Sequence, residues 1–500
     1  MVQSIEPAHH TRSHKRVAVI DFHRISYVIG MMLLVLTVFM VPPALTDILA
    51  GNPDFWVFFG SAFVTGFLGL MMVMSSRGAW ADEIYLKEGF VLTVASWIAL
   101  CMVATIPFIF FGHGMSLTDA WFEAVSGLTT TGATVLDNLD DLPPGILLWR
   151  SIIQWIGGIG IVLMALIMLP FLRVGGMQLF QTENSDRSDK IVAKSSELVR
   201  LIATTYFVMT ALCGMAYAAA GMSAFDALNH AMTTIATGGY STHDLSFGHF
   251  KNPVIHWIGF FFLLAASLPL VLYVKFARTG KWSVWGDTQV QGFLKFVVVA
   301  ITLLSLWYYS TRDVALLDAF RIVAFNSISI ISTAGFALGD YTAWGTGSIG
   351  VFFLFMFMGG CTGSTTGGIK AFRIQIMIIT SRNYLRKLIS PNRVVVAVYN
   401  GKKLPTEIST AVLAYLSVMF ISIMLFTLVL SFFGLDFIDS VSAATSALAN
   451  VGPALGPEIG PAGTFKNLAW ESKLLLTFGM LLGRLEFFTV LVVFSRDFWR

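Results

Sequence analysis

The chain has 500 residues, of which 56% are hydrophobic and 12% are charged, and its formal net charge is +3. Its mean hydropathy of +0.75 excludes a soluble globular protein. A bilayer core about 30 Å thick takes up roughly 20 apolar residues per helix, and stretches of that length recur along nearly the whole chain.

Ten apolar runs predict ten membrane spans. They lie near residues 25–48, 54–75, 91–111, 147–171, 198–220, 254–275, 291–309, 347–380, 407–434 and 470–494, the eighth of them interrupted. The first run is too long for the apolar region of a signal peptide, so we expect it to remain as a span. Four further segments are too short, and too rich in Thr, Ser, Gly and Asn, to cross the membrane; they lie near 117–136, 223–241, 318–337 and 436–453.

Basic residues are divided very unequally between the two sides of these spans. Of 32 Lys and Arg residues, 25 fall on the side that holds the tail 1–25 and the loop 370–403, and four fall on the opposite side. By the positive-inside rule we expect the first side, with both termini, to be cytoplasmic. Arg150 and Lys473 lie near the other ends of their spans, where long basic side chains are expected to snorkel.

Cysteine and histidine give no clear site. The three cysteines, Cys101, Cys213 and Cys361, lack the spacing of a disulfide framework or a metal site, so we expect them to be small buried apolar residues. The tail histidines, His9, His10 and His14, are expected to be solvated.

Each short segment contains a related string, and the four strings align on a glycine. The strings are 128–134, 235–241, 331–337 and 448–454, and the glycines are Gly132, Gly239, Gly335 and Gly452. Their spacings of 107, 96 and 117 residues indicate a unit of about 100 residues in four unequal copies. Thirteen residues earlier lies Asp119, Asp226 or Asp439, which favours a helix N-terminus. The third copy differs, because its Asp318 lies one turn further upstream.

A single glycine in such a loop commonly marks no more than a turn. Four copies on one side of the membrane favour instead short helices that enter the bilayer and end in irregular backbone, which is tolerated only beside protein or a water-filled path. Four such endings can present rings of carbonyl oxygens to a dehydrating cation.

We therefore expect an all-α polytopic membrane protein in which four pseudo-repeats surround one pore. Each repeat would consist of a span, a pore helix, a filter loop and a second span. The expected boundaries are 1–80 for the tail and two extra spans, then 81–185, 186–285, 286–400 and 401–500 for the four repeats.

The strings also carry a resemblance to a known family. Thr130-Thr131-Gly132-Ala133, Ala236-Thr237-Gly238-Gly239-Tyr240-Ser241-Thr242, Ser332-Thr333-Ala334-Gly335-Phe336 and Asn450-Val451-Gly452-Pro453 resemble, in order, the four filter signatures of the Trk/Ktr/HKT potassium-transporter superfamily. The resemblance covers about residues 80–500, and the two extra spans make the bacterial TrkH/TrkG/TrkI branch more similar than the eight-span KtrB branch.

The resemblance implies potassium uptake across the bacterial inner membrane, with K⁺ as the transported ion rather than a bound cofactor. It implies a filter of backbone carbonyls from Thr130, Thr131, Gly132, Thr237, Gly238, Gly239, Thr333, Ala334, Gly335, Asn450, Val451 and Gly452. It also implies a homodimer in the lipid bilayer and a separate cytosolic, nucleotide-binding regulatory ring like TrkA. The basic loop 370–403 could receive that ring or lie against anionic lipid. No nucleic-acid partner is expected.

Two further features lie along the expected path. The segment 358–370 contains Gly359, Gly360, Gly363, Gly367 and Gly368 and cannot favour a continuous helix. It could serve close helix packing or phosphate binding, although the Walker spacing is absent; the resemblance favours an intramembrane gate. Arg484 lies within the last apolar run, where a charge must face a cavity or a partner. The resemblance implies that it faces the pore, and a structural ion pair is the alternative.

Other function classes fit less well. A membrane-embedded enzyme would need a base beside the hydroxyl-rich strings, and none is apparent in the sequence. A transporter of organic solutes would show inverted repeats with charges at the membrane midplane, whereas these copies are parallel. A K⁺/Na⁺ or H⁺-coupled symporter of the same fold remains the main alternative to a passive pore.

Overall fold

The computed structural model describes residues 20–76, 85–112, 114–168, 191–280 and 286–500, without the side chains of 163–168 and 191–196. The tail histidines lie outside this part. Its regular structure is helical apart from one short antiparallel hairpin, in which β1 (Val398–Tyr399) pairs with β2 (Lys402–Lys403). The fold class is all-helical, as predicted, and the hairpin forms at an exposed loop where a turn at Asn400 and Gly401, both with positive φ, reverses the chain.

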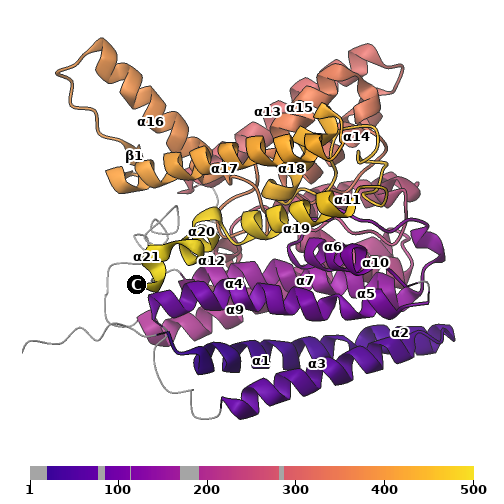
Figure 1. Cartoon of the computed structure of the whole chain (residues 1–500). Helices are drawn as coiled ribbons and strands as arrows, with labels where there is room; N and C mark the ends of the chain where they lie inside the picture. Colours follow the sequence, from indigo (N-terminus) through magenta and orange to yellow (C-terminus); the bar gives the residue numbers. More distant parts are fainter. Residues whose placement is uncertain (1–19, 77–84, 113, 169–190, 281–285) are drawn as a thin grey trace, which may run out of the picture.

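Three N-terminal helices lie along one edge of the molecule (Figure 1). They are α1 (Phe22–Phe39), α2 (Val41–Ala50) and α3 (Phe55–Ser75). Helices α1 and α3 pack closely at Gly30 and Gly69, because neither residue has a side chain to keep the two backbones apart. A Cβ added to either glycine would lie 2.9 Å from the carbonyl oxygen of the other.

The remaining helices form four successive units, each of which contains one short helix of 12 to 16 residues that leads into a glycine string. Unit 1 has α4 (Leu86–Ala104), α5 (Ile106–Phe110), α6 (Leu117–Leu128) and α7 (Pro144–Met168); unit 2 has α9 (Ile191–Ala219), α10 (Ala224–Ile235), α11 (Pro253–Ala266) and α12 (Leu270–Thr279). Unit 3 has α13 (Thr288–Thr311), α14 (Leu316–Ile331), α15 (Thr346–Met356) and α16 (Ala371–Ile389); unit 4 has α17 (Thr406–Phe432), α18 (Phe437–Ala449), α19 (Trp470–Arg484) and α20 (Phe487–Phe494), before the terminal α21 (Arg496–Trp499). Three short 3₁₀ turns, η1 (Leu139–Asp141), η2 (Ser246–His249) and η4 (Thr342–Trp344), follow α6, α10 and α14.

Seven helical stretches within the described residues are long and apolar enough to cross a membrane, and two bent pairs bring this to nine. The expected eighth span is interrupted as predicted, since α15 ends at Met356 and α16 begins at Ala371. The expected sixth and tenth spans are not continuous: α11 and α12 meet at 89°, and α19 and α20 at 109°.

The local chemistry explains the first of these bends. Pro269 has no N–H to continue the helix, and the next N–H, that of Leu270, donates to the Gly363 carbonyl oxygen at 3.0 Å instead of within a helix. The second bend follows Arg484, and there Glu486 has a positive φ of 65°.

The short helices begin where the aspartates predict. Ser116 and Ser223 cap α6 and α10, their hydroxyls accepting from the N–H groups of Asp119 at 3.1 Å and Asp226 at 3.0 Å. Helix α14 has 16 residues against 12 in α6 and α10, and it begins earlier, so Asp318 still lies in its first turn. The displaced aspartate of the third copy therefore reflects a longer helix.

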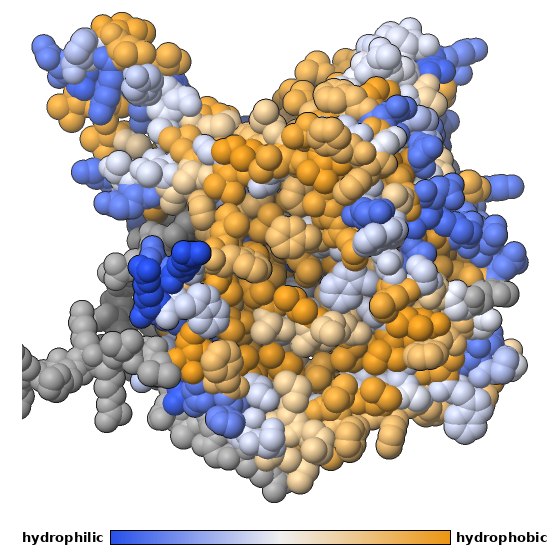
Figure 2. Space-filling model, viewed as in Figure 1, coloured by the Kyte–Doolittle hydropathy of each residue, from blue (hydrophilic) through white to orange (hydrophobic). Residues whose placement is uncertain are grey.

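The outside of the bundle is apolar around its middle. Phe63, Leu303 and Met424, from three different helices, are 75%, 64% and 72% exposed. Figure 2 shows a broad hydrophobic region through the middle of the view, with hydrophilic residues gathered on its left and right sides. This is the surface of a protein that is embedded in lipid.

Candidate functional site: a ring of four glycine loops

The four short helices pack in a closed cycle. The long helix that follows each of them contacts the short helix of the next unit, through the pairs α7–α10, α11–α14, α15–α18 and α19–α6. The last pair returns from unit 4 to unit 1. The strings that follow the short helices, which we call glycine loops 1 to 4 (residues 128–134, 235–241, 331–337 and 448–454), are therefore brought to one place.

Each short helix ends in the same backbone motif. The residue two positions before the aligned glycine of each loop has a left-handed φ, namely 53° at Thr130, 51° at Thr237, 57° at Thr333 and 55° at Asn450. The following N–H donates back to the carbonyl five residues earlier at 2.8–2.9 Å, in the bonds Thr131–Ser126, Gly238–Thr233, Ala334–Ser329 and Val451–Ser446. This is the Schellman arrangement, which ends a helix and turns the chain away from its axis.

The four aligned glycines close the ring by direct contact. Each has positive φ, and a Cβ added to it would strike a carbonyl oxygen of the next loop. The distances are 2.2 Å from Gly132 to Gly238 O, 1.9 Å from Gly239 to Ala334 O, 2.3 Å from Gly335 to Val451 O and 2.7 Å from Gly452 to Thr131 O. Every contacted oxygen belongs to the residue just before the next glycine, so glycine is needed here both for its φ and for space.

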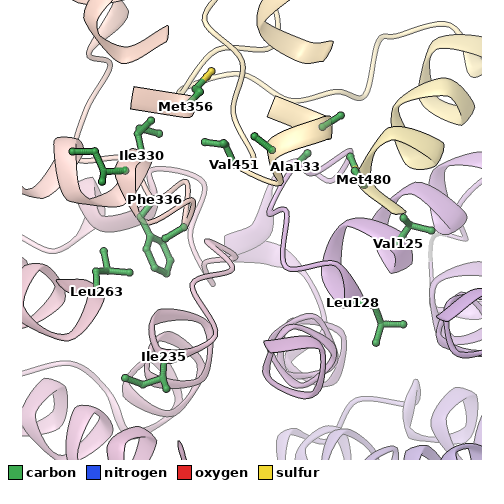
Figure 3. Packing of buried hydrophobic residues seen from close by; sticks show 14 of the residues in the cluster. Val125, Leu128, Ala133, Ile235, Leu263, Ile330, Phe336, Met356, Val451 and Met480 are labelled. Carbon is green, nitrogen blue, oxygen red and sulfur yellow. The ribbon is translucent and has the colours of Figure 1, made fainter. Parts of the chain in front are cut away.

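The contacted carbonyls differ in their hydrogen bonds. Gly238 O accepts from Gln154 Nε2 at 2.6 Å, and the side-chain oxygen of Gln154, Oε1, accepts from Tyr240 N at 3.1 Å. In the described part of the chain, no donor binds the carbonyl oxygens of Thr131, Ala334 or Val451. Figure 3 shows three apolar residues of these loops: Ala133 and Val451 lie near each other above the centre of the view, and Phe336 lies to their left.

A buried ion pair supports loops 1 and 2 from behind. Arg150 of α7 binds Glu123 of α6 at 2.8 Å, and it also donates to Ser241 O at 2.9 Å and to Thr134 Oγ1 at 3.1 Å. Its guanidinium lies 4.0 Å from the centre of the Tyr240 ring. Because Arg150 is only 1% exposed, the expectation that it snorkels was wrong.

Lys473 also differs from its expectation. It is buried, and its ammonium binds Asp119 at the start of α6 at 2.5 Å and Lys466 O at 2.7 Å. It therefore joins units 4 and 1 instead of reaching for the membrane surface.

The segment 358–370 lies against the C-terminal ends of the short helices. Thr365 Oγ1 donates to Ile235 O at 3.0 Å, Gly367 N donates to Thr333 Oγ1 at 2.7 Å, and Gly368 N donates to Ala449 O at 2.8 Å. These bonds reach units 2, 3 and 4 in turn. Positive φ at Gly359, Gly363 and Gly368 allows the segment to fold compactly. At Gly360 the limit is space, because a Cβ added there would lie 2.8 Å from the Ser267 carbonyl oxygen.

Arg484 completes this contact with unit 1. Its guanidinium donates to Thr365 O at 3.0 Å and to Gly157 O of α7 at 3.3 Å, and the side chain is buried. Glu486 binds Arg373 and not Arg484. No carboxylate pairs with Arg484 among the described residues.

The sequence interpretation missed Glu123, Gln154 and the pairing of Arg150. A signal was present, because an acid and an arginine at bilayer depth are both costly unless they meet. The three cysteines are buried and free, as expected.

The fold and this site define a class: a multi-span membrane protein in which bent, re-entrant helices bring irregular backbone together at the centre of the bundle. The TrkH family model, described as cation transport protein, matches residues 60–499. The chain therefore belongs to the TrkH family of cation transport proteins, and the family is one of transporters, not enzymes.

Individual relatives agree over the full length. The Trk system potassium uptake protein TrkI of Halomonas elongata is 42% identical over 477 residues, covering 95% of this chain and 96% of that protein. TrkH of Escherichia coli K12 is 34% identical, covering 96% and 99%. The crystal structure of the potassium transporter TrkH from Vibrio parahaemolyticus matches with a TM-score of 0.87 at 32% identity, over 96% of this chain and 100% of that one. The resemblance to the bacterial Trk branch is thus confirmed.

Proposed function

We propose that this chain takes up potassium ions across the inner membrane of a bacterium, through a single opening surrounded by its four units. The observation that carries the proposal is the closed cycle in which each glycine lies against the next loop's carbonyl oxygen. Four chain segments meeting in this way form a ring of backbone oxygens, and such oxygens can replace the hydration shell of a monovalent cation. The repeat boundaries 81–185, 186–285, 286–400 and 401–500 belong to this proposal.

The filter would use backbone carbonyls and not side-chain charges. Its residues are Thr130, Thr131, Gly132, Thr237, Gly238, Gly239, Thr333, Ala334, Gly335, Asn450, Val451 and Gly452. The four short helices end at these loops, so their partially negative C-terminal ends favour a cation between them. One N–H group of each loop donates to a carbonyl of the preceding helix end, which supports an outward N–H and an inward C=O orientation.

The segment 358–370 and Arg484 would form the gate. The segment binds three of the four units beneath the glycine loops, and Arg484 links it to the fourth. A buried arginine near the path of a cation adds an electrostatic barrier. Opening would require these few hydrogen bonds to break together.

The direct test is ⁸⁶Rb⁺ uptake into proteoliposomes with competing K⁺ and Na⁺. A serine in place of Gly132 would press on Gly238 O, so Gly132→Ser should widen or distort the ring and let Na⁺ compete several-fold better. Gly350→Ser is the matched control, because nothing lies within 4 Å of a Cβ there. Unchanged competition in folded Gly132→Ser protein would contradict the proposed filter. Repeating the uptake with an imposed proton gradient distinguishes a passive pore from an H⁺-coupled symporter.

The expected partners follow from two surfaces. Helix α16 extends away from the body of the bundle (Figure 1) and exposes Tyr384, Leu385, Leu388 and Ile389, which suits a second copy in a homodimer within the bilayer. The basic residues of 370–403 suit a cytosolic nucleotide-binding ring like TrkA. Crosslinking through single cysteines on α16 would test the dimer, and loss of ring binding after charge reversal at Arg393 and Lys403, which lie beyond α16, would test the second surface.

A further inference from the structure

Three side chains that could ligate a metal meet outside the glycine loops. They are Asp140 in η1, His243 just before η2, and His249 at the end of η2. Their ligand atoms all lie within 4.8 Å of one another. Asp140 follows loop 1 and the histidines follow loop 2, so the cluster joins units 1 and 2. The same two stretches are already tied together, because Leu139 N donates to both carboxylate oxygens of Asp244 at 3.1 Å.

The geometry of the cluster is that of two imidazoles beside carboxylates. His243 Nδ1 contacts Asp140 Oδ1, and its Nε2 lies 3.4 Å from Asp226 Oδ1. The rings of His243 and His249 are parallel, with centroids 3.5 Å apart and an angle of 3° between them. A metal binds an imidazole in the plane of its ring, so the stacked His249 must turn about its side-chain bonds to ligate. It is exposed and free to do so.

The donor set selects a class of ion. Two imidazole nitrogens and one carboxylate suit Zn²⁺ and its neighbours Ni²⁺ and Cu²⁺, which prefer nitrogen ligands, and not Mg²⁺ or Ca²⁺, which prefer oxygen. Zn²⁺ would retain water in its fourth position, since no other ligand of this kind lies in the cluster within the described ranges.

We propose that Asp140, His243 and His249 form a binding site for a divalent transition metal of the Zn²⁺ class on the face opposite the basic loops. His243 lies four residues after Gly239, so a bound Zn²⁺ places a double positive charge near the outer end of the glycine ring and clamps units 1 and 2. Occupancy therefore slows the entry of monovalent cations. This consequence, though not the binding itself, rests on the proposed function.

Binding is measured first, with the full-length protein in detergent and a histidine-free affinity tag. Zn²⁺ titration by calorimetry and Co²⁺ absorption are compared for the unaltered chain, His249→Ala and Asp140→Asn. Each of the two variants loses one proposed ligand, so its affinity for Zn²⁺ at this site should fall at least about tenfold, which is what the loss of a residue that only supports a ligand costs. The absorption of bound Co²⁺ should weaken in both variants. The control removes the tail histidines (His9→Ala, His10→Ala, His14→Ala) and should retain the site. Unchanged affinity in both cluster variants, or loss of binding in the tail control, overturns the proposal.

Transport is measured second, as ⁸⁶Rb⁺ uptake with Zn²⁺ on one side of the vesicle at a time. Inhibition from the side opposite the basic loops, relieved several-fold in His249→Ala, supports the proposal. Equal inhibition of both proteins overturns the slowing of ion entry. Absence of any Rb⁺ uptake without Zn²⁺ contradicts the proposed function alone, because the binding result is independent of it.

Discussion

The helix ends at Thr130, Thr237 and Thr333 carry a conformation that threonine rarely adopts. A β-branched residue with positive φ is strained by about 1–3 kcal/mol, and glycine or asparagine is the usual choice at this point of a Schellman cap. Asparagine does occupy it in loop 4, at Asn450, where its Nδ2 donates to Thr131 Oγ1 at 3.0 Å. The strain is held in place because the adjoining loops contact each other on both sides.

Residue-level reasoning from the sequence therefore identified the glycines but not the helix ends. The usual rule would place each glycine directly after its helix, whereas α6, α10 and α14 end four residues before the glycine and α18 ends three residues before it. The reason for each glycine lies in another unit, about 100 residues away for three of them and more than 300 for Gly452, and no local pattern contains that contact. The pairing of Glu123 with Arg150 was overlooked for the same reason, since the two residues lie 27 positions apart in the sequence.

The Arg150–Glu123 pair gives a prediction about stability. Arg150→Ala leaves the Glu123 carboxylate buried without an opposite charge, its remaining hydrogen bonds coming from Thr134 and Val135, and an unpaired buried charge costs about 3–5 kcal/mol. Lys466→Ala breaks the pair with Asp137, whose side chains are 52% and 47% exposed, and an exposed pair contributes about 0–1 kcal/mol. Thermal unfolding in detergent should therefore show a large loss of midpoint temperature for the first variant and little for the second. Similar midpoints for both would contradict a structural role for the buried pair.

At the scale of elements, the bends were the features that hydropathy could not reveal. A window of apolar residues averages over a break, so 254–275 and 470–494 were both expected as straight spans. Pro269 was a usable signal for the first bend. The second has no such signal, because Glu486 adopts its positive φ beside Arg373, which α16 supplies. By contrast, the interruption before α16 was predicted, because five glycines within one run give that run a low helix propensity.

The bend after α19 leaves Arg484 free to reach the segment 358–370, and this gives a second prediction. Arg484→Ala removes two hydrogen bonds from a charged group, each contributing about 1.5–3 kcal/mol. If they hold the segment closed, ⁸⁶Rb⁺ flux should rise by at least about tenfold, because the loss of only about 1.4 kcal/mol already corresponds to that factor.

Arg484→Lys separates charge from bonding in the same assay. Lysine keeps the positive charge but not the forked geometry that joins Thr365 O to Gly157 O. Flux as low as in the unaltered protein would assign the barrier to charge, and flux as high as in Arg484→Ala would assign it to the two bonds. Equal or lower flux in folded Arg484→Ala protein would count against any gating role.

At the scale of the whole molecule, four unequal sequences form one ring with the same backbone. The spacing of the strings predicted four units. The helix contacts join unit 1 to unit 2, unit 2 to unit 3, unit 3 to unit 4 and unit 4 to unit 1. What the spacing could not provide is the asymmetry within the ring. Gln154 holds the carbonyl of loop 2 alone, α14 is longer than α6 and α10, and the segment 358–370 comes only from unit 3.

This asymmetry predicts unequal tolerance at the four glycines. A Cβ would lie 1.9 Å from the facing oxygen at Gly239, 2.2 Å at Gly132, 2.3 Å at Gly335 and 2.7 Å at Gly452. Alanine substitutions should therefore destabilise most at position 239 and least at position 452, because backbone oxygens cannot move aside as flexible side chains do. Gly51→Ala is the reference, since Gly51 has a φ of +70° with nothing within 4 Å and so reports backbone strain alone, about 1–2 kcal/mol. Thermal unfolding of the five variants measures the order. If all four ring variants match Gly51→Ala, positive φ alone explains the glycines and the contacts between loops contribute nothing; if position 452 is the least tolerant, the ring is packed differently from the contacts described.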